Sequence, residues 1–299
     1  MKIACLTVIY PEMMDFVGEY AENIKRQTRK DFELIIINDG VISGFKEVFE
    51  KVSIPVHVFD CSLSHQKNRL FGLSICQKRG YDVVICSDSD EVMPPDRVQR
   101  IREFFLDHKE EKAVFNNVVS QLNGRHFDLI YKEIIRLEDI LDFNVLGYGA
   151  MSIRAELIPF VLEHENKNIT VFDWWLAMVY LLKYPYVRFL SDLCEEARYR
   201  EKTLVGPVFE VREEMVQKGI HIKKILYSEL TQYCQKHNLG DKVGIFLHKL
   251  DEIKAIENFV EAHSLKAYAD RVKKYFTNGE KLYWWRDVIP LSSLEKVKA

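Results

Sequence analysis

The sequence lacks any long hydrophobic run. Unbroken apolar stretches such as Trp174–Tyr180 are far shorter than the roughly 20 residues that span a bilayer. It also lacks a basic excess, because 42 Lys and Arg stand against 45 Asp and Glu and the net charge is −3. This balance argues against nucleic acid as a partner. With 47% hydrophobic and 29% charged residues, the composition is that of a folded protein.

The cysteines form neither a Cys-x-x-Cys pair nor a cluster with metal-ligand spacing. Most of the six lie in apolar segments, where a free thiol behaves as a small hydrophobic side chain. Residues 1–16 resemble a strand that enters a turn, and they contain no small-residue cleavage site of a signal peptide. We therefore expect a protein of the reducing cytoplasm.

Strand and helix patterns alternate through the first half of the chain. The predicted strands are apolar on both faces and cover residues 3–9, 34–37, 56–59, 83–86 and 113–119. Helical spacing of apolar residues separates them, as in residues 16–27, 67–80 and 97–107. This alternation predicts an α/β fold with a mostly parallel sheet covered by helices. In such sheets ligands bind beyond the carboxyl ends of the strands.

The pattern changes near Gly206–Pro207. Residues 208–299 show helical patterns with little strand signal, and they hold 16 Lys and Arg against 13 Asp and Glu, which leaves 26 against 32 before them. The net charge thus changes sign across this junction. We predict one domain over residues 1–206 and a helical C-terminal extension over residues 207–299.

An acidic segment follows the predicted strand at residues 83–86. It reads Ser-Asp-Ser-Asp-Glu and places Asp88, Asp90 and Glu91 within four positions. Carboxylates this close repel one another unless a cation lies between them. Magnesium or manganese prefers such oxygen ligands and usually bridges to substrate phosphates. An acidic turn that caps the helix near Pro95–Asp107 is the alternative, and this segment alone does not decide between them.

Two segments near the start of the chain resemble the inverting family-two glycosyltransferases of GT-A fold. Residues 27–40 match the element in which a helix ending in Gln-Thr leads through Asp-Phe-Glu-Leu into a strand that ends in acidic residues. Residues 6–10 look like the first strand of that family, although Pro11 stands where Asn is usual. This match implies that Thr7 and Tyr10 contact the donor.

Two later segments extend the resemblance in the same order. Residues 66–69, Gln-Lys-Asn-Arg, look like the Ala-Arg-Asn-x-Gly start of a helix, and residues 87–91 look like the Leu-Asp-x-Asp-Asp element of the family. Four ordered matches over about ninety residues are far more specific than any one of them. The resemblance therefore predicts a GT-A, Rossmann-like fold.

The resemblance implies how a nucleotide-sugar donor is bound. Asp39 would accept a hydrogen bond from the base, typically uracil, and Lys67 stands at the position of an arginine that faces the nucleotide. Asp88 would contact the ribose, and Asp90 would hold Mn²⁺ or Mg²⁺ on the diphosphate. Taken without the resemblance, the sequence favours Asp39 as a plain turn residue before Gly40, and Lys67 is equally a solvated charge on a helix.

The acceptor half of the reaction needs a general base. Residues 169–176 resemble the Glu-Asp-x-x-Leu segment of the family, which implies that Asp173 is this base, although Phe172 replaces the Glu. Asp173 could equally be the N-cap of the apolar helix that follows, a common place for Asp. Trp174 and Trp175 would either stack on a sugar ring or belong to the helix core.

Two further segments resemble the family, and one of them departs from its pattern. Residues 147–154 look like the segment that lines the acceptor side, and residues 199–206 look like the Tyr-Arg-Gln-His element, in which Lys202 replaces the histidine. Lysine could still pair with phosphate as a point charge. In the extension, Tyr283–Arg286 would suit a weak association with a membrane surface or packing within the protein. We favour packing, because the positive charge of the extension is small.

Together these patterns predict a metal-dependent, inverting glycosyltransferase of the cytoplasm or the inner face of the membrane. It would move a sugar from a nucleotide sugar, UDP-linked, to a saccharide or lipid-linked saccharide in bacterial polysaccharide or glycoconjugate synthesis. Two alternatives stay open. A nucleotidyltransferase also uses paired carboxylates on a metal, but Tyr10-Pro11-Glu12 is not its Gly-rich phosphate loop. A non-catalytic nucleotide-sugar-binding protein would explain Phe172 and Lys202 as decay.

Overall fold

The computed structural model describes residues 1–41, 44–122, 125–127, 132–197, 211–276 and 285–295. The chain divides into two units. The first unit consists of residues 1–135, 146–165 and 186–199, and the second consists of residues 136–145, 166–185 and 200–299. Two short segments from the predicted first domain thus group with the C-terminal helices. The predicted boundary at residues 206–207 lies outside the described residues.

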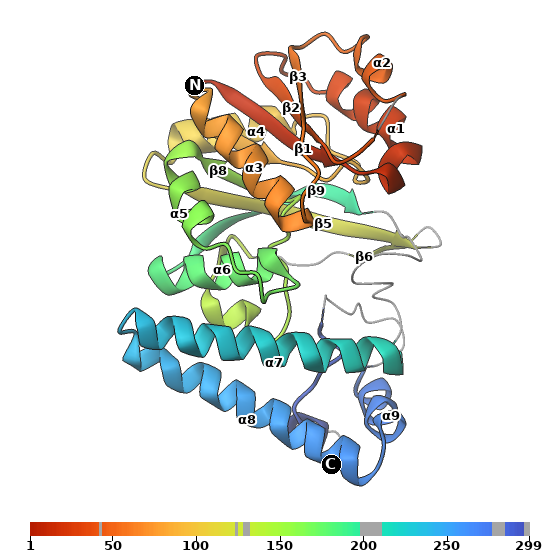
Figure 1. Ribbon diagram of the computed structural model, residues 1–299, viewed down its shortest axis with the longest axis vertical. Helices are drawn as coiled ribbons and strands as arrows, with labels where there is room; N and C mark the ends of the chain where they lie inside the picture. Colours follow the sequence, from red (N-terminus) through yellow and green to blue (C-terminus); the bar gives the residue numbers. More distant parts are fainter. Residues whose placement is uncertain (42–43, 123–124, 128–131, 198–210, 277–284, 296–299) are drawn as a thin grey trace. The chain divides into compact units, whose positions relative to one another are not determined.

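One mixed sheet forms the centre of the first unit (Figure 1). Its strands are β1 (Ile3–Ile9), β2 (Glu33–Asn38), β3 (Val56–Asp60), β4 (Val83–Cys86), β5 (Ala113–Leu122), β6 (Arg125–Phe127), β7 (Ile134–Ile135), β8 (Met151–Arg154) and β9 (Val187–Ala197). Their order is β3-β2-β1-β4-β8-β5-β9-β7, and β6 pairs with β5. The first four strands along the chain are parallel, whereas β8 is antiparallel to β4 and β5. The predicted α/β architecture is confirmed.

Helices cover both faces of this sheet (Figure 1). On one face, α1 (Met14–Lys25), α2 (Lys46–Phe49) and α4 (Arg97–Asp107) share an apolar core with alternating residues of β1, β2 and β4. On the other face, α3 (His65–Lys78) lies so close to the sheet that a Cβ at Gly72 would come 2.7 Å from Leu6 Cδ1, and α5 (Ile158–Glu163) packs beside α3. Burial on both faces explains why β1, β2 and β4 consist almost entirely of apolar residues.

Polar side chains fix the ends of two of these helices. Ser64 is the N-cap of α3, and its Oγ accepts a hydrogen bond from the N–H of Lys67 at 3.4 Å. Arg154, the last residue of β8, donates to the carbonyl oxygens of Phe105 at 2.6 Å and His108 at 3.1 Å. It thereby satisfies carbonyl groups at the C-terminal end of α4.

The second unit is helical. It contains the 3-10 helix η2 (Leu137–Ile140) and the helices α6 (Phe172–Lys183), α7 (Glu213–Lys236), α8 (Gly240–Ala262), α9 (Leu265–Tyr275) and α10 (Leu291–Glu295). Trp174 of α6 donates from its indole N–H to Ile140 O at 2.7 Å, and Tyr227 of α7 donates to Leu141 O at 2.6 Å. These bonds join segment 136–145 to the helices, which is why it groups with them.

The last described segment of the chain packs within the second unit. Trp285 is buried, and a Cβ at Gly219 of α7 would come 3.6 Å from its indole ring. Lys223 of α7 donates to Val288 O at 3.0 Å, and Tyr268 of α9 donates to Ile289 O at 2.7 Å. Trp285 therefore packs within the protein, as we favoured, and its buried ring is not available to a membrane surface. Tyr283 and Trp284 lie outside the described residues.

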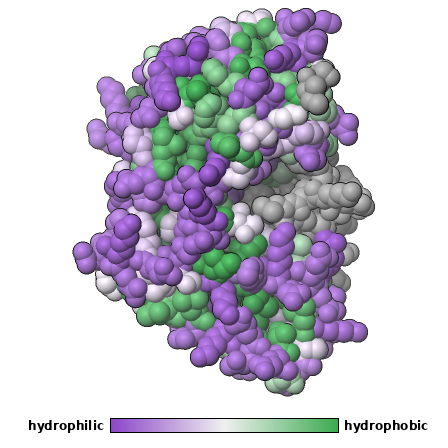
Figure 2. Space-filling view, in the orientation of Figure 1, coloured by the Kyte–Doolittle hydropathy of each residue, from purple (hydrophilic) through white to green (hydrophobic). Residues whose placement is uncertain are grey.

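The surface offers few large hydrophobic side chains. Hydrophilic residues cover most of the face shown in Figure 2, with hydrophobic ones among them. Leu63, Leu106 and Leu247 are the large hydrophobic residues that are exposed in the described part of the chain, and single residues of this kind are ordinary on protein surfaces. No described helix is both long enough and apolar enough to cross a membrane.

Candidate active site

The acidic segment and Asp39 lie at one edge of the sheet of the first unit. Asp39 donates its N–H to Ile9 O at 2.9 Å, and Ser87 donates its N–H to Leu6 O at 2.9 Å. The residues just after β2 and β4 therefore stay beside β1, which lies between these two strands. Because the carboxyl ends of parallel strands meet at the same edge, Asp39 and Ser87–Glu91 share this edge, as the sequence predicted.

The turn after β2 is held by Asn38 rather than by Asp39. The Nδ2 of Asn38 donates to Val41 O at 3.0 Å and to Asp60 Oδ1 at 2.7 Å, and its Oδ1 accepts from the N–H of Val41 at 3.0 Å. Gly40 has a φ of +80°, which favours glycine. The Asn38 side chain thus closes this turn, and the role of the half-buried Asp39 in binding the base stays a prediction.

Asp88 is paired with an arginine of α3. Arg69 Nη2 lies 2.7 Å from Asp88 Oδ1, and the guanidinium also lies over the ring of Tyr148, 4.1 Å from its centroid. The sequence pointed to Lys67 instead, two positions earlier. Two residues along a helix is more than half a turn, so Lys67 and Arg69 face different sides of α3. No ion pair of Lys67 occurs within the described residues, and its contact with a nucleotide stays a prediction.

Tyr10 lies near both predicted donor-binding carboxylates. Its ring stacks on His65, with centroids 5.0 Å apart and planes within 8° of parallel. Burial raises the pKa of its hydroxyl, and the charges of Arg69, Asp88 and Asp39 also act on that group. His65 and Arg69 are four residues apart on one face of α3. This spacing was the signal in the sequence that could have identified both.

The carboxylates of the acidic segment converge on one another. Burial raises the pKa of Glu91 far above its ordinary value, and the charges of Glu195, Asp88 and Asp90 raise it further. A Cβ at Gly149 would come 2.5 Å from Glu91 Oε2 and 3.0 Å from Asp88 Oδ2. The absence of a side chain at Gly149 therefore leaves room for these two carboxylates.

The acidic segment suits a hard divalent cation that shares its ligands with a bound phosphate. Within the described residues, no three His, Cys, Asp or Glu side chains are arranged to hold a metal alone. Glu91 Oε2 is nevertheless buried without a hydrogen-bond partner in that part of the chain. Clustered carboxylates favour Mg²⁺ or Mn²⁺, which commonly complete their coordination with substrate phosphate oxygens. Asp90, the predicted metal ligand, is half-buried in this segment.

Thr7, the other predicted donor contact of the first strand, is buried. It lies within β1, and its side chain has no exposed surface. The family resemblance covered the whole first strand, but only the end of that strand reaches the surface at Tyr10. The contact of Thr7 with the donor stays a prediction, and it would require this buried side chain to become accessible.

Asp173, the predicted general base, belongs to the second unit. It is the second residue of α6, and its Oδ1 accepts a hydrogen bond from the N–H of Trp174 at 2.9 Å. The N-cap of α6 is Val171, so the N-cap interpretation of Asp173 is wrong. Trp174 and Trp175 are both buried, so both belong to the helix core. Lys202 and the whole segment 199–206 around it lie outside the described residues.

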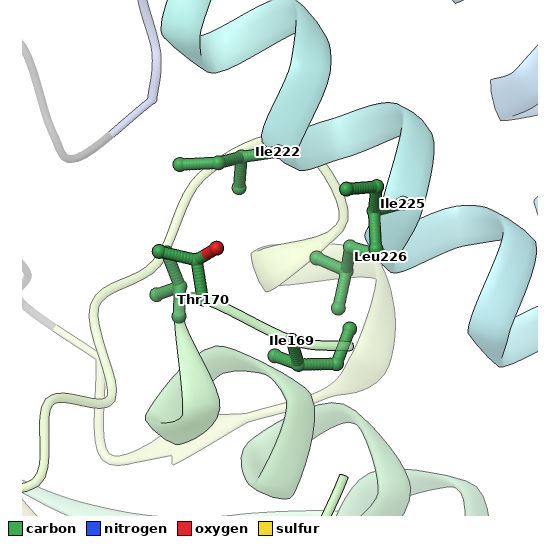
Figure 3. Close-up of a pocket in the computed structure, with 6 residues that line it drawn as sticks. Ile169, Thr170, Ile222, Ile225 and Leu226 are labelled. Atoms are coloured by element: carbon green, nitrogen blue, oxygen red, sulfur yellow. The ribbon is translucent and has the colours of Figure 1, made fainter. Parts of the chain in front are cut away.

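A recess in the second unit is unsuited to a nucleotide. Figure 3 shows it between the residues that precede α6 and the middle of α7; its lining is Ile169, Thr170, Val171, Ile222, Ile225 and Leu226. The Thr170 hydroxyl is the one polar side-chain group in this lining. A diphosphate would meet no charge there, and a buried phosphate needs charged or hydrogen-bonding partners.

The comparisons with known proteins identify the family. The sequence model described as glycosyl transferase family 2 matches residues 5–160, more than half of the chain. The chain belongs to glycosyl transferase family 2. The matched part contains Tyr10, Asp39, Arg69 and the acidic segment, and the predicted resemblance is confirmed. A search of the curated proteins found no match to this chain.

Solved structures of other glycosyltransferases have the same fold. TarS residues 1–349 of S. aureus, in complex with UDP-GlcNAc, is 16% identical with a TM-score of 0.60, over 94% of this chain and 93% of that one. The mannosyltransferase PcManGT of Pyrobaculum calidifontis, in complex with GDP-Man and Mn²⁺, is 13% identical with a TM-score of 0.52, over 89% and 77%. These likenesses confirm the GT-A fold class with its C-terminal helices.

Proposed function

We propose that this glycosyltransferase moves a sugar from a UDP-sugar to an acceptor hydroxyl with inversion at the anomeric carbon. The proposal is supported by one observation: Tyr10, Asp39, Arg69 and the acidic segment lie together at one edge of the sheet of the first unit, in a member of family two. The UDP-GlcNAc bound to TarS supports UDP as the nucleotide. The GDP-Man and Mn²⁺ bound to PcManGT support a nucleotide sugar and a divalent cation.

The residues of the first unit would bind the donor. Asp39 would accept a hydrogen bond from the base, and Asp88 would contact the ribose while Arg69 holds its carboxylate in place. Asp90, with Glu91 beside it, would hold Mg²⁺ or Mn²⁺ on the diphosphate. Such an ion, when bound, neutralises the negative charge that grows on the leaving diphosphate. Without it, the carboxylates of Asp88 and Asp90 would repel the diphosphate.

Asp173 would act on the acceptor. As a general base it would take the proton of an acceptor hydroxyl while the oxygen attacks C1 of the sugar, opposite the departing diphosphate. Attack from the opposite side inverts the configuration at C1. A general base typically contributes about 10²–10⁴-fold to the rate. We propose a saccharide or lipid-linked saccharide as acceptor, in polysaccharide or glycoconjugate synthesis in the cytoplasm.

A donor-consumption assay tests this function. Purified protein is incubated with a panel of nucleotide sugars and saccharide acceptors, with and without Mn²⁺, and UDP and pyrophosphate are quantified. Release of UDP with glycosylated product supports the proposal. Release of pyrophosphate would mean a nucleotidyltransferase, and binding without turnover would mean a non-catalytic protein.

The role of Asp173 has a matched control. Asp173→Asn should transfer sugar at least about a hundredfold more slowly and bind UDP normally, because a base acts mainly in the transition state. Asp241→Asn changes another Asp in the first turn of a helix of the same unit and should leave transfer unchanged. Near-parental turnover of Asp173→Asn would assign the base to another residue.

A further inference from the structure

A buried arginine contacts residues that adjoin the acidic segment. Arg97, the first residue of α4, has no exposed surface. Its Nη2 donates to Cys86 O at 2.9 Å and to Gly149 O at 2.7 Å, and its Nη1 donates to Glu195. One guanidinium thus contacts the last residue of β4 and the glycine that lies against Asp88 and Glu91.

The partner of Arg97 is equally buried. Glu195 of β9 has no exposed surface, and its second carboxylate oxygen accepts from Nδ2 of Asn116 at 3.0 Å. The next residue, Glu196, exchanges two backbone hydrogen bonds with Val92, at 2.9 and 3.1 Å. Val92 follows Glu91 directly, so β9 holds the chain just after the acidic segment.

Hydrogen bonds therefore hold the backbone at both ends of the acidic segment. Arg97 bonds the carbonyl just before Ser87, and β9 bonds the backbone just after Glu91. Carboxylates that repel one another would otherwise spread apart, because the backbone of a turn is easily displaced. Gly149, which sets the space for two of these carboxylates, is held by the same guanidinium.

We propose that the Arg97–Glu195 pair is a positioning pair, which fixes the backbone on both sides of the acidic carboxylates so that a cation and the diphosphate of the donor can be bound together. This inference rests on the proposed function. A buried ion pair is seldom needed for stability alone, since apolar replacements of both partners are often neutral or stabilising. The planar guanidinium donates to two carbonyls and a carboxylate at once, and this fixed geometry holds those three groups in place relative to one another.

The test replaces both charges together. Arg97→Met alone leaves the Glu195 charge buried and uncompensated, so its melting temperature should fall. Arg97→Met with Glu195→Gln removes both charges while Gln can still accept from Asn116, and it should recover much of that loss. The matched control is Arg100→Met with Asp192→Asn, which removes a second ion pair between α4 and β9, at 2.8 Å, that makes no bond to the acidic segment.

The readouts are the Kd of UDP by calorimetric titration and the Mn²⁺ concentration at half-saturation. Both should rise at least about tenfold in the double variant and stay within about twofold in the control. A folded double variant with parental values would overturn the proposal. If it does not fold, Arg97→Lys, which retains a charge beside Glu195, is titrated instead, with the same expected loss. If neither folds, the pair is required for folding itself and the proposal is overturned. A parent protein that binds no nucleotide would refute the proposed function instead.

Discussion

The substitution Gly149→Ala adds one methyl group at the most crowded point of the proposed donor site. Its Cβ would lie 2.5 Å from Glu91 Oε2 and 3.0 Å from Asp88 Oδ2, whereas ordinary contacts of this kind are about 3.5–4.0 Å. The carboxylates must therefore move by roughly 1 Å. Overpacking of this kind destabilises a protein by about 1–3 kcal/mol. Because the displaced groups are those that we propose to bind the cation and the ribose, we expect the Kd of UDP with Mn²⁺ to rise at least about tenfold.

Gly72→Ala is the matched control for this prediction. It adds the same methyl group in the same unit, at 2.7 Å from Leu6 Cδ1 and 3.0 Å from Ile37 Cγ1, so it crowds only apolar side chains of the core. Both variants should melt at lower temperature than the parent, and only Gly149→Ala should bind UDP more weakly. Melting curves and calorimetric titrations measure the two effects. Parental affinity in Gly149→Ala, or equal losses of affinity in both variants, would refute the placement of the donor beside Gly149.

Three further predictions concern substitutions in the first unit. Asp39→Ala should weaken UDP binding about tenfold with or without Mn²⁺, because it removes a hydrogen bond to the base rather than a cation ligand; a loss seen only with Mn²⁺ in a titration would contradict this. Arg69→Met should weaken donor binding much more than Lys67→Met, because Arg69 pairs with Asp88; the opposite ranking of the two KM values would restore Lys67 to that role. Glu33→Gln should lower the melting temperature at pH 7, with a difference from the parent that shrinks on acidification. Hydrogen bonds from Tyr81 first and then His57 lower the pKa of Glu33 from its ordinary 4.5, so its contribution is present above that value and is lost as the pH falls through the folded pKa. A constant difference in melts at pH 3–7 would show that its charge is unimportant.

The parallel half of the sheet could be predicted because its strands are buried on both faces. The predicted spans 3–9 and 83–86 match β1 and β4, since a strand covered by helices is an unbroken apolar run. The antiparallel β8 and the long β9 were not predicted. Two of the four residues of β8 are polar, Ser152 and Arg154, and β9 alternates buried and half-buried positions with charged side chains, so neither shows such a run.

The candidate site was predictable where its residues directly follow a strand. Asp39 and Asp88 lie at the expected edge because parallel strands end together. The burial of Thr7 was not predicted, because a motif match does not separate buried from exposed positions of a strand. The pairing of Arg69 with Asp88 was not predicted, because the motif was matched by sequence position and not by helix face. Arg97 and Glu195 are 98 residues apart in the sequence, and no local pattern relates them.

The most direct test of the donor site is a calorimetric titration of the parent protein and of Asp90→Ala with UDP, in the presence and absence of Mn²⁺. In the parent, UDP should bind saturably and more tightly with Mn²⁺, because the ion joins the acidic segment to the diphosphate. Asp90→Ala should retain the parental melting temperature and lose the effect of Mn²⁺ on UDP affinity. The same Mn²⁺-dependent gain in affinity in Asp90→Ala and in the parent would contradict the assignment of the acidic segment as the diphosphate site.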